Sequence, residues 1–351
     1  MSNMSDVARA AGVSVSTVSH VINGTRPVDP ATEQAVQQAI RNIGYIPNTL
    51  ARSLARSATN TIGVAISTFA NHYFTDIVRS IDVACERAGL TMLLADTHDD
   101  PAQELRVVQS FHQRRVDGIL LAPSNDGHMP SLSYLRRSQI PAVLVDHLQD
   151  APFDQVGTDN AAATDKLVSH LIAHGHRRIG FISGAVSNST SGERLVGYRQ
   201  ALHTAGLPFD EALVACGESS IEPARQATHR LLAVTPKPPT AIVSGNNLMT
   251  LGALRAFNEG RIAIPGQIAF AAFDDFDWAD LFTPSLTVIS QPLESIGAEA
   301  ARRLILRIGG SDAPPETHRL PSSLKIRASC GCAVAGAAGK HANLAVPGAT
   351  S

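Results

Sequence analysis

From Thr61 onward, short apolar segments alternate with longer amphipathic ones. The apolar segments are TIGVAIS, LTMLLAD, VDGILLA and PAVLVD, followed by RRIGFIS, ALVAC, TAIVS and QIAFAAF. The segments between them place apolar residues at helical spacing over ten or more positions. Short buried strands separated by helices of this length predict βαβ units, and therefore parallel sheets with helices packed on their faces.

The pattern restarts near residue 156, so the chain is expected to form two α/β lobes of similar size. Helices are predicted at 74–87, 101–114 and 129–138 in the first set and at 160–174, 194–205, 221–233 and 246–258 in the second. The segment LTVISQP and a helix at 293–308 are predicted to return to the first lobe. The first lobe would then comprise 61–158 and 291–329, and the second 159–290. A ligand is expected between the lobes, at the carboxyl ends of the strands.

The first 46 residues predict a separate headpiece of short helices. Ser5 is the expected N-cap of the first helix, and Gly12 ends it, because glycine reaches the left-handed conformation of a sharp turn. Ser14 is expected to cap a second helix over 15–23, and a third follows the Asp-Pro pair at 29–30. Two short helices joined by a glycine turn form the helix-turn-helix layout, which presents its second helix to a DNA major groove.

The outward side chains of the second helix suit contacts with duplex DNA. Val15 could touch a thymine methyl group, Ser16 could bond either type of base, and His20 could donate to a purine acceptor. Thr17 and Ser19 are better suited to phosphate contacts, which position the protein without reading sequence. The alternative is that these residues form only the polar face of a small helical bundle, and composition alone does not separate the two.

Several motifs, in a fixed order, resemble those of the LacI/GalR (lactose-repressor) family. They are DVARAAGVSVSTVSHVING, GYIPNTLARSLARS and TIGVAI, then VDGILLAPS, GHRRIGFISG, ERLVGYRQAL, NNLMTLGALRAF, FAAFDDF and LTVISQPLESIGAEAA. The resemblance covers about residues 4–329. It implies an all-α helix-turn-helix headpiece and an α/β core of two lobes like that of periplasmic sugar-binding proteins. It also implies a transcriptional regulator, most often a repressor, whose affinity for a palindromic operator is set by a small effector, expected to be a sugar or sugar derivative.

The resemblance gives a role to residues 47–58, which from their composition alone could be a linker with little fixed structure. In the family this hinge becomes helical on the operator, and the leucine that matches Leu54 wedges into the central base step. Such a wedge costs a few kcal/mol of unstacking, offset by wider contact with bent DNA. The expected DNA contacts are Ser5, Val15, Ser16, Thr17, Ser19, His20 and Asn23 in the headpiece and Asn48, Ala51 and Leu54 in the hinge. His20 is a departure, because many relatives carry arginine there and imidazole cannot copy its forked contact with guanine.

Polar residues stand where predicted strands end. Asp146 follows PAVLV, Asn246 follows TAIVSG and Asp274 follows AFAAF, while Arg194 is expected to open the helix after NSTSG. Carboxylates, an amide and a guanidinium that converge on one cleft suit a hydroxyl-rich ligand, because each makes paired hydrogen bonds. The family resemblance implies effector contacts at these same four positions.

An apolar or stacking wall is expected beside these groups, from Phe74 or from its neighbours Tyr73 and Phe69. Each acid could instead be a solvated loop residue or a helix cap, as for Asp275. His147 stands where relatives often carry arginine, so the resemblance leaves the charge of the pocket open.

Charge and cysteine use narrow the class of protein. The net charge is −2, so the chain as a whole is not a strongly basic protein that covers nucleic acid nonspecifically. Residues 1–58 are more basic, with five arginines against three acidic residues. No signal peptide or apolar run near ~20 residues is present, so a cytoplasmic protein without membrane contacts is expected. Cys85 and Cys216 are expected to be buried thiols. Cys330 and Cys332 could bind a metal or act as a redox pair, but no partner ligand lies nearby in sequence.

The sequence also predicts what the protein lacks. The three histidines at 170–176 fit a helix end, so neither a metal site nor a cofactor is expected. No GxGxxG follows a strand and no Walker loop is present, so catalysis is not expected. The rival classes are a sugar-uptake binding protein, which needs an export signal and no helix-turn-helix, and a sugar-handling enzyme, which needs a nucleophile or general base in the cleft.

A homodimer is expected through the first lobe, around the helices at 74–87 and 101–114. The tail at 330–351 is rich in alanine and glycine and lacks leucine heptads. It is therefore expected to be disordered and not to assemble a tetramer.

Overall fold

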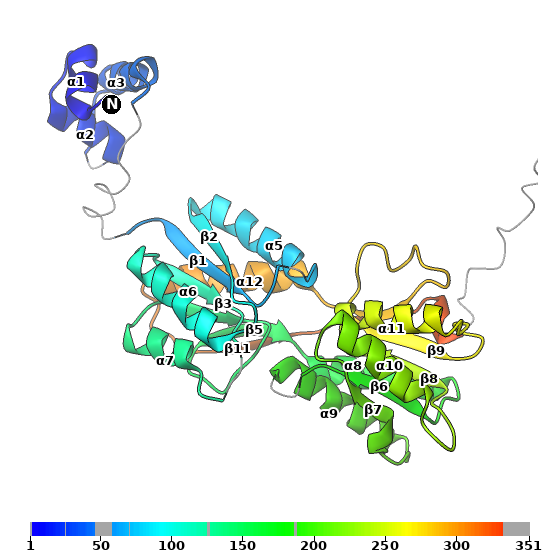
Figure 1. The fold of residues 1–351 in the computed structure, drawn as a ribbon. Coiled ribbons are helices and arrows are strands. Elements are labelled where there is room, and N and C mark those ends of the chain that lie inside the picture. Colours follow the sequence, from blue (N-terminus) through cyan, green and yellow to red (C-terminus); the bar gives the residue numbers. More distant parts are fainter. Residues whose placement is uncertain are drawn as a thin grey trace, which may run out of the picture. The chain divides into compact units, whose positions relative to one another are not determined.

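The computed structural model describes residues 2–24, 26–45, 58–69, 71–124, 127–185 and 188–332 (Figure 1). These residues group into two compact units. One contains the N-terminal residues to Thr61 together with Arg115–Asp117, and the other contains the rest of the chain. The predicted DNA contacts Asn48, Ala51 and Leu54 lie outside the described residues, as does the tail from 333 onward.

Three helices form the N-terminal unit: α1 (Met4–Ala11), α2 (Val15–Asn23) and α3 (Pro30–Ile43). Their apolar faces meet in a small core, at the centre of which Val7, Val18 and Val36 are completely buried. Gly12 ends α1 in the left-handed conformation, with φ 68°, as the predicted turn requires. The predicted caps of α2 and α3 are confirmed, since Ser14 accepts from the Thr17 N–H and Asp29 accepts from the N–H groups of Ala31 and Thr32.

The predicted cap of α1 is wrong. Asn3, not Ser5, caps the helix, because its side chain accepts from the N–H groups of Ser5 and Asp6. The Asp6 carboxylate accepts in return from the Asn3 N–H at 3.0 Å. This reciprocal capping box satisfies three orphan donors, which the single Ser5 hydroxyl could not do.

A six-stranded sheet forms the first lobe, in the order β11-β5-β4-β3-β1-β2. Its strands are β1 (Thr61–Ile66), β2 (Thr91–Asp96), β3 (Gly118–Leu121), β4 (Ala142–Val145), β5 (Asp154–Thr158) and β11 (Thr317–Leu320). The central strands are apolar on both faces because helices cover both. The pairings from β1 through β3, β4 and β5 to β11 are parallel.

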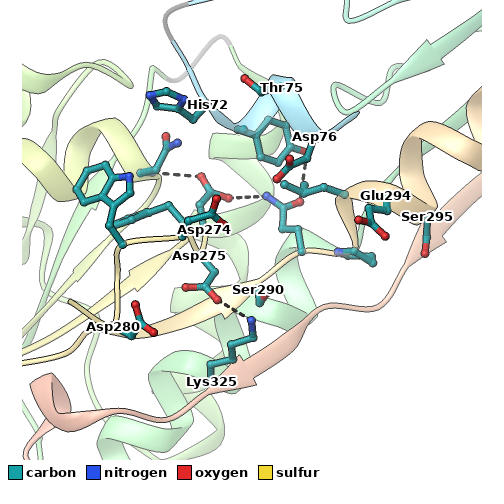
Figure 2. Close-up of a pocket in the computed structure, with 18 of the residues that line it drawn as sticks. His72, Thr75, Asp76, Asp274, Asp275, Asp280, Ser290, Glu294, Ser295 and Lys325 are labelled. Atoms are coloured by element: carbon teal, nitrogen blue, oxygen red, sulfur yellow. Dashed lines mark hydrogen bonds and ion pairs between the residues drawn. The ribbon is translucent and has the colours of Figure 1, made fainter. Parts of the chain in front are cut away.

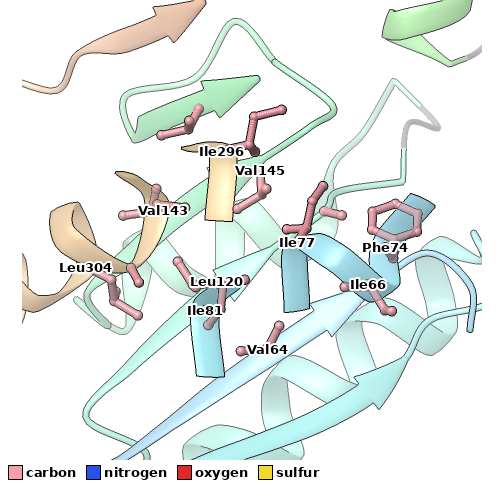
Figure 3. Close-up of a cluster of buried hydrophobic side chains, with 14 of the residues drawn as sticks. Val64, Ile66, Phe74, Ile77, Ile81, Leu120, Val143, Val145, Ile296 and Leu304 are labelled. Atoms are coloured by element: carbon pink, nitrogen blue, oxygen red, sulfur yellow. The ribbon is translucent and has the colours of Figure 1, made fainter. Parts of the chain in front are cut away.

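Four helices cover this sheet: α5 (Tyr73–Ala88), α6 (Pro101–Gln113), α7 (Pro130–Arg137) and α12 (Leu293–Ile308). Helices α5 and α12 pack against each other and against one face of the sheet. Figure 3 shows Ile77 and Ile81 of α5 and Ile296 and Leu304 of α12 in one buried cluster with side chains of the strands. The predicted return of the chain to this lobe through α12 is therefore confirmed.

A second six-stranded sheet forms the other lobe, in the order β12-β10-β9-β8-β6-β7. Its strands are β6 (Ile179–Ser183), β7 (Val214–Cys216), β8 (Ala241–Ser244), β9 (Ala269–Phe273), β10 (Thr287–Ser290) and β12 (Ser323–Lys325). All its pairings are parallel except that of β12, which runs antiparallel to β10. Its helices are α8 (Asn160–Ala173), α9 (Ser189–Thr204), α10 (Ile221–Leu232) and α11 (Asn247–Glu259), with the short 3-10 helices η1 (Glu211–Leu213) and η2 (Ala328–Cys330).

The predicted position of residues 323–329 in the first lobe is wrong. Strand β12 and helix η2 belong to the second lobe, and side chains fasten them there. Asp275 accepts from Lys325 Nζ at 2.7 Å and from Arg327 Nη1 at 2.9 Å, while Ser329 Oγ donates to the Phe270 carbonyl at 2.7 Å. Asp275 is thus an ion-pair partner and not a helix cap. The chain crosses between the lobes three times, after β5, β10 and β11.

Two further features complete the fold. Cys85 is buried as predicted, whereas Cys216 is exposed, because it ends the short edge strand β7. Within the described ranges, no helix combines the length and apolarity that a membrane crossing needs.

Candidate functional site

The two strand-exit carboxylates predicted from the sequence occupy equivalent places in the two lobes. Asp146 follows β4 with φ 67° and Asp274 follows β9 with φ 76°. Left-handed backbone is uncommon for residues other than glycine and clusters at functional sites. Both side chains are almost completely buried, with exposed fractions of 5% and 4%. Buried carboxylates at matched strand ends mark the place where a ligand would be bound.

Two buried side chains, Tyr73 and Gln291, lie between these carboxylates, and each donates a hydrogen bond to one of them. The Tyr73 hydroxyl donates to Asp146 Oδ1 at 2.6 Å and lies 3.4 Å from Gln291 Oε1. Gln291 Nε2 in turn donates to Asp274 Oδ1 at 2.6 Å. Burial raises the pKa of Asp274, although Arg194 acts in the opposite direction. Burial and the neighbouring Asp146 raise the pKa of Tyr73 well above its usual value, so its hydroxyl stays a donor.

Arg194 is the cation of the site, and its position in the fold differs from the predicted one. Helix α9 begins at Ser189 with Asn188 as its cap, so Arg194 lies in the second turn and does not open the helix. Its Nε donates to Asn160 Oδ1 at 2.9 Å and its Nη1 to the Gly245 carbonyl at 2.6 Å. The guanidinium carbon also lies 3.8 Å from the centre of the Phe273 ring. These contacts hold a buried cation in one orientation.

His147 brings a second basic group next to Asp146. Its Nε2 lies 3.2 Å from Asp146 Oδ2 and 3.2 Å from Asn188 Nδ2. Its Nδ1 lies 2.9 Å from the Pro123 carbonyl, which can only accept, so Nδ1 carries a proton. The imidazole is therefore oriented by the first lobe and contacts the second lobe through Asn188.

A cavity of about 340 Å³ contains all five predicted effector residues and lies between the lobes. Asp146, Arg194, Asn246, Asp274 and Phe74 all line it, together with Ser67, Thr68, Asn71, Tyr73, His147, Asn188, Thr190 and Ser191. The volume is at the lower end of the range usual for small-molecule sites. Donors, acceptors and an aromatic wall thus face one space, as a polyhydroxylated ligand requires.

Three of the expected residues have additional or different roles. Phe74 belongs to the core of the first lobe and is 3% exposed, so only its edge reaches the cavity. Asn246 caps α11, because its side-chain oxygen accepts from the Met249 N–H at 2.8 Å. Phe69 does not line the cavity and is 53% exposed, so the aromatic wall comes from Tyr73 and Phe74.

Sequence reasoning missed Asn160, Asn188 and Gln291. Asn160 orients Arg194, Asn188 contacts His147, and Gln291 joins Tyr73 to Asp274. Each stands at a strand exit or helix start, so the rule that selected Asp146 could have selected them too.

A larger cavity of about 780 Å³ shares Tyr73 and Asp274 with the smaller one (Figure 2). Several of the side chains that line it are acidic, and Figure 2 shows Asp275 joined to Lys325. Its further acids are Asp76, Asp277, Asp280 and Glu294. Its cations Lys325 and Arg327 are both paired with Asp275. We place the candidate ligand site in the smaller cavity, because all five predicted effector residues line it.

The second helix of the N-terminal unit has a polar outer face. Ser16 is exposed, and Val15 is 43% exposed. Thr17, Ser19, His20 and Asn23 are half-buried, and Asn23 Nδ2 donates to Ser19 Oγ at 3.1 Å. Ser5 is exposed on α1. The helix therefore presents a small apolar group and hydroxyls at its N-terminal end.

Both parts of the chain match known families. Residues 3–48 match "Bacterial regulatory proteins, lacI family". Residues 59–330 match "Periplasmic binding proteins and sugar binding domain of LacI family". The ribose operon repressor of Escherichia coli (strain K12) is 36% identical over 310 residues, which cover 88% of this chain and 93% of that protein.

Solved structures resemble the chain over nearly its whole length. The lac repressor dimer bound to operator and the anti-inducer ONPF aligns with a TM-score of 0.85 and 27% identity, covering 94% of this chain and 99% of that one. The complex of the transcriptional regulator CelR with cellobiose aligns with a TM-score of 0.72 and 32% identity, covering 94% and 100%.

Proposed function

Given that the chain belongs to the LacI family of bacterial regulatory proteins, we propose that it represses transcription as a homodimer on a palindromic operator, under the control of a sugar-like effector. The observation that carries this proposal is the set of buried donors and acceptors between the lobes of a chain that also has a helix-turn-helix headpiece. Asp146 comes from one lobe, and Arg194 and Asp274 come from the other. A ligand held by both lobes changes the relative free energies of different arrangements of the lobes. An allosteric effector must act in this way.

The effector is proposed to be a small sugar or sugar derivative. Vicinal hydroxyls can donate to the carboxylates and can accept from Arg194. The apolar face of a sugar can pack against the rings of Tyr73 and Phe74. The names of two similar proteins refer to ribose and to cellobiose, which supports this class of ligand. These names describe a repressor and a regulator, and we propose that the cleft of this chain binds its ligand without transforming it.

The DNA-binding surface is proposed to be the N-terminal half of α2. Val15 and Ser16 would face base edges, and His20 would set a base preference different from that of relatives with arginine there. Thr17 and Ser19, with Ser5 and Asn23, would contact the backbone. We propose residues 1–46 as the headpiece and 47–58 as a hinge that contacts the minor groove through Asn48, Ala51 and Leu54.

The dimer is proposed to form through the first lobe, beside α5 and the edge strand β2. Val83 on α5 and Leu94 on β2 are each 41% exposed, so this face carries apolar side chains at the surface. A symmetric pair of first lobes would bring two headpieces to a symmetric operator. Such a regulator acts where the chromosome is, in the bacterial cytoplasm.

The test begins with operator selection from a pool of random duplexes and thermal-shift screening against a sugar panel. We expect one palindromic sequence, one class of stabilising sugar and an operator affinity that changes when that sugar is added. The sugar should be recovered unchanged after incubation. A protein without preference for any duplex, with or without metabolites, would contradict the proposal.

The hinge role is tested by Leu54→Ala. Loss of the apolar wedge should remove most of the operator affinity and leave the thermal shift with effector unchanged. Wild-type operator affinity in this variant would exclude the wedge.

A further inference from the structure

Two motifs that appeared unrelated in the sequence meet on the second lobe. Cys330 and Cys332 follow β12 near the end of the described chain, and His170 lies on α8, far earlier in the sequence. The fold brings them together because β12 and η2 pack onto the second sheet on the side that α8 covers. No third ligand lies near the two cysteines in the sequence, but the fold brings His170 next to them.

The three donor atoms face one another. His170 Nε2 lies 3.5 Å from Cys330 Sγ and 3.2 Å from Cys332 Sγ, and the two sulfur atoms are 2.9 Å apart. Gly331 makes this possible, because its φ of 79° turns the chain sharply and leaves both sulfurs on the same side. Cys330 is buried, while His170 and Cys332 are half-buried, so the group is open to solvent on one side.

We propose that His170, Cys330 and Cys332 form a binding site for one thiophilic metal ion, Zn²⁺ in the first instance. Two thiolates and one imidazole are a usual donor set for zinc, which binds sulfur at about 2.3 Å and nitrogen at about 2.0–2.1 Å. Tetrahedral coordination at these lengths places the donor atoms about 3.5–3.8 Å apart. The present separations are somewhat smaller, so the donors must move outward by less than about 1 Å to admit the ion. The fourth position is open to water or to an external donor.

A metal site accounts for the imidazole better than a redox pair does. Neighbouring thiols can form a disulfide without a third group, whereas here the same ring nitrogen approaches both sulfurs. The ion would join η2, at the end of the last crossover between the lobes, to α8 of the second lobe. It would bind the folded chain only, and would therefore stabilise it as its concentration rises. This site is separate from the effector cleft and does not depend on the proposed effector.

The test uses the full-length protein, reduced and freed of metal, and titrates it with Zn²⁺ against a chromophoric chelator. We expect one ion per chain, a higher melting temperature with Zn²⁺, and thiolate charge-transfer absorption when Co²⁺ replaces it. Cys332→Ser and His170→Gln should each weaken Zn²⁺ binding by more than about tenfold. Cys332 is half-buried at the end of the described chain, so its variant should fold and can decide the question alone.

Matched controls are Cys216→Ser and His203→Ala, which remove an exposed thiol and an exposed imidazole of the same lobe. Both should bind Zn²⁺ like the wild type. Absence of stoichiometric binding, or equal affinity in Cys332→Ser, would overturn the proposal. Formation of a Cys330–Cys332 disulfide in air, with no Zn²⁺ binding after reduction, would overturn it as well and identify a redox pair.

Discussion

Arg194 is fixed by three different kinds of contact, so its charge is presented to the cleft in one direction. It donates to Asn160 and to the Gly245 carbonyl, and its plane lies over Phe273. A guanidinium oriented before the ligand arrives loses little entropy on binding, and its hydrogen bonds to the ligand are charge-assisted. We therefore expect the residue to contribute to the affinity for the effector.

Replacing this residue should separate effector sensing from DNA binding. Arg194→Ala is expected to lower effector affinity by about tenfold or more, because each lost hydrogen bond to a charged group costs about 1.5–3 kcal/mol. Operator binding without effector should remain, since α2 is unaltered. The control is Arg199→Ala on the same helix, where the guanidinium lies over the exposed Phe209 ring. Anisotropy with labelled operator measures both; a normal effector response in Arg194→Ala would exclude its role.

Glu104 on α6 is a carboxyl that the fold buries outside the cleft. Its Oε2 accepts from the Ser124 N–H and hydroxyl at 2.5 Å each, and Ser131 donates to the other oxygen. Burial raises the pKa of Glu104 above its usual 4.5, although these hydrogen bonds act in the opposite direction. The folded chain therefore holds this proton more tightly than the unfolded chain does.

The sign of the resulting pH dependence can be tested. A raised pKa contributes stability that is fully present below pH 4.5 and is lost as the pH rises through the folded value. Glu104→Gln removes this titration. The free energy of unfolding of the variant, relative to wild type, should increase between about pH 4 and about pH 8, by ~1.4 kcal/mol for each pH unit of the raise. Urea titrations measure it, with Glu86→Gln at an exposed site as control; a pH-independent difference would contradict the assignment.

At the scale of helices, three pairs pack closely within the lobes. Helix α5 packs against α12 in the first lobe, and in the second lobe α8 packs against α9 and α10 against α11. In each pair a glycine faces a backbone carbonyl of the partner helix. Gly197 faces Ala161, Gly252 faces Ile221, and Gly297 faces Ile77, where an added Cβ would lie 2.5 Å from the carbonyl oxygen. Only the absence of a side chain allows this approach.

A matched pair of substitutions on α9 tests this packing. At Gly197 an added Cβ would collide with the Ala161 carbonyl and lie 2.9 Å from Thr164 Cβ, whereas at Gly192 nothing lies within 4 Å. Gly197→Ala should lower the free energy of unfolding by about 1–3 kcal/mol through overpacking. Gly192→Ala should raise it by about 0.5–1 kcal/mol, because alanine is the better helix former. Chemical denaturation measures the free energy of unfolding of both variants. Equal changes at the two positions would show that helix propensity, and not packing, determines the effect of the substitution.

Local patterns were sufficient to predict most helices and strands, because burial on a parallel sheet leaves continuous apolar runs such as AVLV and AIVS. The strand-exit rule likewise predicts that Asp146 and Asp274 lie in the cleft, and both line it. Long-range partners could not be predicted this way. Strand β12 has three residues, too few to specify a lobe, and the contact of His170 with Cys330 depends on where that strand pairs. Ser5 was misread for a local reason, since Asn3 and Asp6 already form a capping box.

At the scale of the whole molecule, the chain is a DNA-binding regulator whose two lobes are joined through the cleft itself. Asn247 Nδ2 of the second lobe donates to Asn71 Oδ1 of the first at 2.7 Å. Tyr73 donates to Asp146, and Gln291, which follows β10 at a crossover between the lobes, donates to Asp274. A ligand that enters the cavity must compete with or add to these contacts. We therefore expect effector binding to change the relative stability of different lobe arrangements.

This linkage makes a quantitative prediction about the intact dimer. If the effector changes operator affinity by some factor, saturating operator must change effector affinity by the same factor, because both describe one coupling free energy. We expect about 5–150-fold, which corresponds to ~1–3 kcal/mol. Calorimetric titration of the effector with operator duplex, and with a scrambled duplex as control, measures one side, and anisotropy with and without effector measures the other. An effector that binds the cleft while both factors equal one would mean that the lobes do not control the headpieces.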